Sequence, residues 1–318
     1  MWKNKIRLYL RYIIGLSVIA ALVYHVQSQQ DIIPVLSQFD ISVLFPALMI
    51  IVVHLLCLFT LWRRIIRNLG QINSGNRLLI HSFLGGRTLG FITPGQTGEL
   101  LKGMFFTSGI RLKGTSLSMI YAGYGMLVRT ILGCIASIYF ILKIPILFAV
   151  NIKAVSVFII IFLLGMIVLI LVNKVRIMWY LNRFFPSQAM DLIHIFKLQI
   201  QSKSFSQFIV LLSLALVANL LAALAFMVLL SGFQIHVLDI HGLMAFEAAY
   251  FAMSLLPITP SGIGIREGSR VYFFSLIGCS QSAVLCASVI MFGLNIMLPA
   301  VLGVGSLKYF WKQKSEKA

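Results

Sequence analysis

Six apolar runs restrict what this chain can fold into. Each is long enough for a helix that crosses a hydrocarbon layer of about 30 Å at about 1.5 Å per residue. The runs cover residues 8–26, 41–62, 115–141, 154–173, 206–232 and 282–307. Hydrophobic residues make up 60% of the chain, charged residues only 11%, and the mean hydropathy is +0.98. We therefore predict an all-α polytopic membrane protein with six transmembrane helices, folded as a single membrane domain over residues 1–318.

Two stretches break the apolar pattern in the same way. Residues 93–99 are TPGQTGE and residues 255–267 are LLPITPSGIGIRE, so prolines, glycines and charges fall in apolar surroundings. Irregular backbone at membrane depth is tolerated only where protein buries it or where it lines a wet cavity. The short apolar arms beside the two stretches cover residues 78–92, 100–110, 242–256 and 269–277. We predict two re-entrant broken-helix hairpins. The alternative is kinked full-length helices, which would give an eight-span bundle.

The basic residues indicate the orientation of the chain. We place the N-terminus in the cytoplasm and let both hairpins return to the side from which they enter. The inside segments then hold 21 of the 26 Lys and Arg residues, which is a strong positive-inside bias. These segments are residues 1–11, 63–114, 174–205 and 308–318. We expect a multi-pass protein of the cell (inner) membrane with both termini cytoplasmic, and an interfacial segment at 174–205.

This topology divides the chain into two halves, residues 1–142 and 154–307. Each half has two spans, a hairpin and one more span, but the first half starts inside and the second outside. Inverted repeats of this kind are the usual plan of secondary transporters, in which broken helices meet near the bilayer midplane. The net charge of +18 does not indicate nucleic acid, because every basic cluster flanks an apolar run and not a soluble face.

The two breaks carry the residues that suit an anionic group. We expect the amide groups of helix ends after Pro94 and Gly264 to point toward such a group, with arginines and a lysine adding charge at the same depth. Phosphate fits a site of this kind. The predicted substrate-binding residues are Arg87, Thr93, Gln96, Thr97, Glu99, Lys102, Arg129, Thr259, Ser261, Gly262, Gly264, Arg266, Glu267 and Arg270.

Ionisable groups inside the membrane are costly, so each needs a reason. Arg129 would cost about 3 kcal/mol or more if it faced lipid, and we expect it to face the other helices. Glu99, Glu247 and Glu267 are candidates for coupling transport to an ion, with proton coupling as a hypothesis. The alternatives are that Glu99 and Glu267 only neutralise neighbouring bases and cap the broken helices, and that Glu247 extends to the outer surface.

No catalytic constellation emerges, so we expect no enzymatic activity and no cofactor. The glycines of GIGIREG have the wrong spacing for a dinucleotide loop, and no strand precedes them. His236, Asp239 and His241 lack the spacing of a standard metal site and fit a solvated loop better. The four cysteines lie in or beside apolar segments as packing residues.

Both breaks, with the helices around them, resemble the membrane region of the lysylphosphatidylglycerol synthase family. This region is the flippase-like domain of multiple peptide resistance factors and their stand-alone relatives. The resemblance rests on GRTLGFITPGQTGELLKG at 86–103, on Arg129 and on LLPITPSGIGIREG at 255–268, and it extends over nearly the whole chain. Relatives often have an acidic residue where this chain has Val128, which leaves Arg129 without an adjacent neutralising group.

The resemblance implies a domain that moves lipids with polar headgroups between leaflets. We therefore expect a flippase-like transporter for a phospholipid or a polyprenyl-phosphate-type lipid, with the two breaks meeting near the midplane and Glu99 approaching Glu267. The soluble aminoacyl-transferring domain is absent from the sequence, so we do not expect this chain alone to lysinate lipids. The alternatives are an integral-membrane transferase that uses a lipid-linked donor, and a non-transporting scaffold for an envelope enzyme. Possible protein partners are a second copy or a separate lipid-modifying enzyme.

Overall fold

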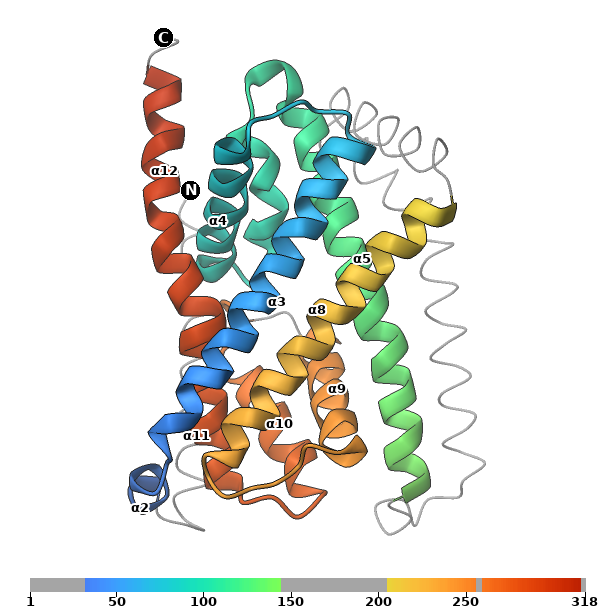
Figure 1. Cartoon of the computed structure of the whole chain (residues 1–318), viewed down its shortest axis with the longest axis vertical. Helices are drawn as coiled ribbons and strands as arrows, with labels where there is room; N and C mark the ends of the chain where they lie inside the picture. Colours follow the sequence, from blue (N-terminus) through green and yellow to red (C-terminus); the bar gives the residue numbers. More distant parts are fainter. Residues whose placement is uncertain (1–31, 144–204, 256–258, 316–318) are drawn as a thin grey trace, which may run out of the picture. The chain divides into compact units, whose positions relative to one another are not determined.

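The computed structural model describes residues 32–143, 205–255 and 259–315, and this part of the chain is helical without strands. Its elements, labelled as in Figure 1, are α2 (Ile32–Ser37), η1 (Ile41–Val43), α3 (Leu44–Arg64), η2 (Ile65–Leu69), α4 (Asn76–Ile92), η3 (Thr97–Phe105), α5 (Ser108–Lys143), α8 (Phe205–Ser231), α9 (Ile240–Leu255), α10 (Ile265–Ser275), α11 (Gln281–Phe292), η5 (Gly293–Met297) and α12 (Leu298–Ser315). The predicted spans 8–26 and 154–173 and most of the interfacial segment 174–205 lie outside the described residues.

Four apolar helices in the described ranges are long enough to cross a membrane. They are Ile41–Leu69, Gly109–Lys143, Phe205–Ser231 and Gln281–Leu307. These spans confirm four of the six predicted runs. The last of them contains the π-helical turn η5, which ends at Met297. Helix α12 begins at the next residue and has Pro299 in its first turn. A proline cannot donate to the carbonyl four residues earlier and its ring clashes with that group, which favours a local widening of the helix.

Each break separates two short helices that pack against one another. In the first pair, α4 is followed by η3, a 3₁₀ helix that lies back against it. The close approach requires glycine, since a Cβ added at Gly98 would lie 2.2 Å from the carbonyl oxygen of Leu89. The second arm ends at Phe105 and not at 110 as predicted, because a turn from Gly103 to Phe106 separates it from α5.

The second break lies between α9 and α10, which also pack against each other. In Figure 1, α4 and η3 lie toward the end where α3 finishes, whereas α9 and α10 lie toward the opposite end. The two pairs of short helices therefore enter the helical assembly from opposite ends, and the break of one pair meets the break of the other.

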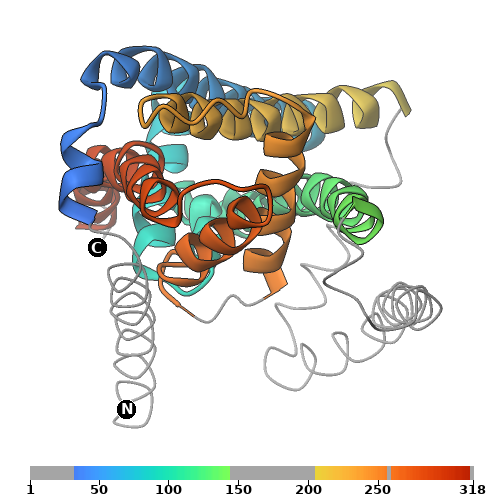
Figure 2. The same cartoon turned by 90° about the horizontal axis from the view of Figure 1, so that it is seen from below.

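The longer helices enclose these pairs. Helix α3 packs along α8, and α12 packs along α4. Figure 2 shows α3 and α8 side by side along one edge of the described part. The buried His54 ring nitrogen Nδ1 lies 2.7 Å from the carbonyl oxygen of Ala218, which joins the two helices by a polar contact.

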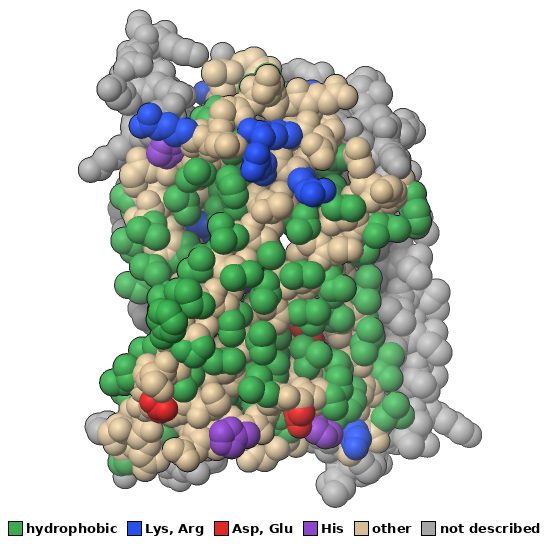
Figure 3. Space-filling model, viewed as in Figure 1, with side chains coloured by type: hydrophobic (Ala, Val, Ile, Leu, Met, Phe, Trp, Pro, Cys, Tyr) green, Lys and Arg blue, Asp and Glu red, His purple; other side chains and the backbone are tan. Residues whose placement is uncertain are grey.

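Charged side chains are unevenly spread over the face drawn in Figure 3. Most Lys and Arg atoms gather toward the end where α3 finishes. The Asp and Glu atoms and most His atoms lie at the opposite end or in the middle of this face. The middle of this face is mainly hydrophobic. This distribution agrees with the charge bias on which the sequence-based topology rests.

Candidate functional site

The two breaks are joined through their backbones. Pro94 lies opposite Pro260 in an isolated antiparallel bridge. The amide of Gly95 donates to the carbonyl of Thr259 at 3.1 Å, and the amide of Ser261 donates to the carbonyl of Thr93 at 3.2 Å. The Ser261 hydroxyl adds a bond of 2.8 Å to the carbonyl of Phe91. The prediction that the two broken stretches meet is confirmed.

The two turns also have the same local geometry. After each proline come two residues with left-handed backbone, Gly95 and Gln96 in the first turn and Ser261 and Gly262 in the second, with φ between 50° and 72°. Within each turn the second left-handed residue donates its amide to the threonine that precedes the proline. The bonds between the turns are reciprocal. A local two-fold relation therefore links the segments that begin at Thr93 and Thr259.

The expectation that helix-end amides would be available to an anion is wrong for the first break. The amide of Gln96 donates to Thr93, that of Thr97 to Pro94, and that of Gly98 to the Thr93 hydroxyl at 2.6 Å. In the second break, the amide of Gly264 donates to a Glu267 carboxylate oxygen at 2.7 Å. These amides are hydrogen-bonded within their own breaks, so the positive charge at the site comes from side chains.

The first cluster of charged side chains is built around Glu99. One carboxylate oxygen lies 2.9 Å from Arg87 Nη1 and the other 2.7 Å from Lys102 Nζ. Lys102 is fully buried, and its ammonium lies 3.7 Å from the centroid of the Tyr121 ring, a cation–π contact. A Cβ at Gly86 would lie 2.3 Å from Lys102 Cγ, so glycine makes room for this buried lysine.

The second cluster contains two arginines and one carboxylate. Glu267 accepts a hydrogen bond from Arg266 Nε at 3.0 Å as well as the one from Gly264. Arg270 forms no ion pair with a carboxylate of the described residues. Instead its guanidinium lies 4.5 Å from the Phe226 ring centroid and 5.2 Å from that of Phe246. Arg266 and Arg270 are both about 95% buried.

Three buried donors in the second cluster and the turn before it lack a partner within the described part of the chain. They are Arg266 Nη2, Arg270 Nη1 and the hydroxyl of Thr259. Buried polar groups of native proteins are nearly always hydrogen-bonded, so unpaired guanidinium donors of this kind indicate a missing acceptor. The donors belong to residues on and just after the second turn, beside the bridge to the first.

Arg129 lies between the two clusters. Its guanidinium stands 4.8 Å from the ring centroid of Tyr250 on α9, and it interacts electrostatically with Glu99 and Glu247. The prediction that Arg129 faces the other helices is confirmed. Acidic residues on other helices offset part of its charge, which explains how Val128 is tolerated as its neighbour.

Glu247 is buried with 1% of its surface exposed, so the alternative that it extends to the outer surface is wrong. One carboxyl oxygen accepts from Asn219 Nδ2 at 2.6 Å, and the other has no hydrogen-bond partner among the described residues. The reason is steric, because α9 lies against α8 and α10 at this level.

Sequence reasoning missed Tyr121, Tyr250 and Asn219. Tyr250 lies within electrostatic range of Arg87 and Arg270 as well as over Arg129, so it stands among bases of both clusters. A signal was present in the sequence, since Tyr250 lies three residues after Glu247 and therefore shares its helix face. Asn219 is likewise the only amide side chain within the apolar run of α8 after Gln207.

The predicted site residues therefore fall into three groups. Arg87, Glu99 and Lys102 form the first cluster, and Arg266, Glu267 and Arg270 form the second, with Arg129 between them. The predicted approach of Glu99 to Glu267 stays a prediction, because each carboxylate is engaged by bases of its own cluster. The third group consists of residues in the two turns, together with Gly264 at the start of α10. These residues are Thr93, Gln96, Thr97, Thr259, Ser261, Gly262 and Gly264.

Comparison with known proteins gives one match. A family model described as the lysylphosphatidylglycerol synthase TM region matches residues 12–303, a range that includes both breaks and Arg129. No curated protein and no solved structure matches.

Proposed function

The chain belongs to the lysylphosphatidylglycerol synthase TM region family, and from this membership and the site we propose that it is a flippase-like transporter of lipids. The family is a membrane domain associated with lipid flipping or modification. The proposed substrate is a phospholipid or a polyprenyl-phosphate-type lipid, whose headgroup binds between the two breaks and passes from one leaflet to the other.

The observation that carries this proposal is the excess of base at the breaks, where Lys102, Arg266 and Arg270 are buried and Arg87 and Arg129 are partly buried. Five bases, Arg87, Lys102, Arg129, Arg266 and Arg270, are accompanied by three carboxyl groups, those of Glu99, Glu247 and Glu267. Removing a charge from water is costly unless it is paired and hydrogen-bonded. A bound anion supplies the missing partner, and Arg266 and Arg270 have donors that lack one among the described residues.

Phosphate is the anion that suits these donors best. A guanidinium offers a planar fork of N–H groups that matches the oxygens of a phosphate, and such charge-assisted bonds are strong. The aromatic rings under both arginines hold their guanidinium planes in place before a ligand binds. A lipid phosphate would enter this site while its acyl chains stay among the apolar helix faces.

The two-fold relation between the turns supports an inverted repeat. We propose six transmembrane helices and two re-entrant hairpins, with the repeat halves at 1–142 and 154–307 and the breaks near the midplane. In this arrangement both termini face the cytoplasm from the cell membrane. Rocking of one half against the other would then expose the headgroup site to each leaflet in turn.

Among the three acids, Glu247 is the best candidate for coupling. Glu99 contacts two bases, and Glu267 contacts one base and caps α10, so both are committed to their clusters. Glu247 has only the Asn219 amide as a hydrogen-bond partner in the described part, and it interacts electrostatically with Arg129, whose guanidinium lies over the Tyr250 ring. We propose that it carries a proton that is exchanged as the headgroup binds and leaves.

Translocation in reconstituted vesicles tests the proposal. Purified protein should move a headgroup-labelled lipid between leaflets, measured by the loss of label to a reductant added outside. Arg129→Gln should slow this movement about tenfold or more, since it removes charge from the centre of the site. Arg77→Gln removes the same charge from an exposed position in the first turn of α4 and should leave the rate unchanged. Equal rates for wild type and Arg129→Gln would contradict the site.

We further propose that the chain is not an enzyme by itself. Two of the three carboxyl groups at the breaks are held by bases, which leaves them unsuited to act as a general base. Purified protein given lipid-linked donors should form no new lipid product by mass spectrometry. A product that disappears in Glu247→Gln would instead favour the transferase alternative. A second copy or a lipid-modifying enzyme is the proposed protein partner.

A further inference from the structure

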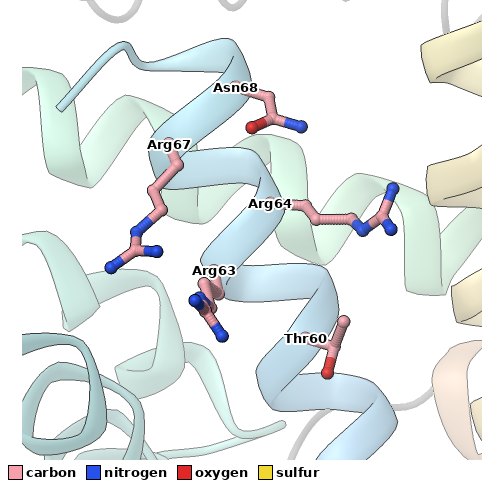
Figure 4. A pocket seen from close by; sticks show the side chains of 5 residues that line it. All are labelled: Thr60, Arg63, Arg64, Arg67 and Asn68. Atoms are coloured by element: carbon pink, nitrogen blue, oxygen red, sulfur yellow. The ribbon is translucent and has the colours of Figure 1, made fainter. Parts of the chain in front are cut away.

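The end of α3 carries a polar stripe that the central site does not use. Thr60, Arg63, Arg64, Arg67 and Asn68 follow the spacing i, i+3, i+4, i+7, i+8, which places them on one face of a helix. They line a pocket with a volume of about 400 Å³. Figure 4 shows their side chains spreading from the face of α3 and η2 turned toward the viewer.

The residues between these positions face the other way. Leu61, Trp62, Ile65, Ile66 and Leu69 are buried in the core. The Trp62 ring centroid lies 5.9 Å from Lys102 Nζ, so the inner face of α3 contacts the first cluster. The pocket and the central site therefore lie on different faces of the same helix and share no residue.

Among the described residues, three arginines and no carboxylate line the pocket. Arg63 and Arg64 are exposed. The guanidinium of Arg67 donates to Asn76 Oδ1 at 2.8 Å and to the Ser74 carbonyl at 3.4 Å, which fixes its position. Within the described ranges no acidic side chain forms an ion pair with any of the three; the carboxylates that form ion pairs are those of Glu99 and Glu267. The pocket is therefore complementary to an anion.

The same stripe becomes apolar toward the other end of α3. Phe45, Met49, Val52, Val53 and Leu56 continue the spacing back from Thr60, and each is at least 40% exposed. The arginines lie in the last turns of the span Ile41–Leu69, the level at which lipid headgroups meet a helix. One face of α3 thus offers an apolar strip about three turns long that ends in three cations.

We propose that this pocket binds the phosphate of an anionic glycerophospholipid from the adjoining leaflet, with an acyl chain along the exposed apolar strip of α3. A soluble phosphate would match the arginines alone, whereas a lipid matches both parts of the stripe. This is a second lipid site, independent of whether the central site transports.

Binding of phosphatidic acid to the purified chain in detergent tests this site, with native mass spectrometry to count bound lipids. Measurements use the Arg270→Gln background, which disables the proposed central site. The double variant Arg63→Gln/Arg64→Gln should lower the affinity about tenfold or more, since each base near a membrane surface contributes to the attraction of anionic lipid. Phosphatidylcholine should bind more weakly than phosphatidic acid, and inorganic phosphate at millimolar concentration should not displace the lipid.

The matched control is Arg77→Gln/Lys113→Gln, which removes two charges from the starts of α4 and α5 and should change the affinity less than about twofold. An equal loss of affinity in this control would overturn the proposed pocket, because the removal of any two bases would then weaken lipid binding. Displacement by inorganic phosphate would overturn the lipid assignment, and unchanged binding in the pocket variant would overturn the site itself. If the double variant does not fold, Arg64→Gln against Arg77→Gln makes the same comparison.

Discussion

Pro94 lies opposite Pro260 at the point where the two broken helices touch, and neither proline can donate a hydrogen bond. The bonds come from the neighbours, from Gly95 to Thr259 and from Ser261 to Thr93. In an antiparallel pair, alternate opposed residues make no bond with each other, so two prolines fit this position without loss. The bridge makes the two halves of the site depend on each other.

Thr93→Val should loosen the first turn. The Thr93 hydroxyl accepts from the Gly98 amide at 2.6 Å and donates to the Leu89 carbonyl at 2.9 Å. Valine keeps the shape but leaves both groups unpaired, at an expected cost of about 1–3 kcal/mol in the free energy of unfolding. Equilibrium unfolding in detergent measures this loss. Thr97→Val, at an exposed position, is the control and should cost less than about 0.5 kcal/mol.

Gly303→Ala should separate α12 from α4. A Cβ at this position would lie 2.2 Å from the Leu84 carbonyl oxygen and 2.3 Å from the Thr88 hydroxyl, which itself donates to Ala300. We expect a loss of about 1–3 kcal/mol from overpacking, measured by thermal unfolding. Gly305→Ala lies on the same helix, with no described residue within 4 Å of the added Cβ. Its melting temperature should not fall, and equal losses in both variants would contradict the close packing.

Glu99→Gln should be much more harmful to the fold than Glu247→Gln. The first change leaves the buried Lys102 and the partly buried Arg87 without their counter-charge, at an expected cost of about 3–5 kcal/mol. The second removes a carboxyl that forms no ion pair with a base of the described residues and keeps an acceptor for Asn219, so stability should change little. Unfolding of both variants in one detergent compares them. Similar losses would show that Glu247 is held in an ion pair.

Arg270→Gln should separate stability from function. The Arg270 guanidinium is buried between Phe226 and Phe246 without a carboxylate partner in the described part of the chain, so removing its charge should leave stability equal or higher. Lipid translocation should fall about tenfold or more, because the headgroup loses a charged donor. A variant that is less stable and fully active would contradict this assignment.

Glu247→Gln should abolish the dependence of translocation on a proton gradient. Wild-type vesicles should respond to an imposed pH difference, since the proposed carrier exchanges its proton with each cycle, whereas the amide cannot titrate. Asp239→Asn is the control, because asparagine keeps the bond that Asp239 Oδ1 accepts from the Gly242 amide at the start of α9. If translocation by Glu247→Gln still responds to the proton gradient, Glu247 is not the proton carrier and another residue has this role.

Local sequence was sufficient to predict the described membrane-spanning helices and the positions of the two breaks. Apolar runs of span length lie in α3, α5, α8 and the α11–α12 segment, because lipid requires every backbone group to be bonded within its own helix. The prolines at 94 and 260 and the glycines beside them end those helices by local sterics alone. The charged residues around the breaks were also evident, since ionisable groups are rare in apolar surroundings.

What the sequence by itself determined is therefore the set of described spans, the two breaks and the candidate charges, all of which follow from properties of neighbouring residues. Only the tertiary structure decided how these charges are partnered. Glu99 lies between Arg87 and Lys102, Arg129 reaches Tyr250, and Glu247 is buried against Asn219. It also showed that the turn amides bond within the turns and between them. Such contacts join residues up to 168 positions apart, and a partner at that distance is fixed by helix packing and not by spacing along the chain.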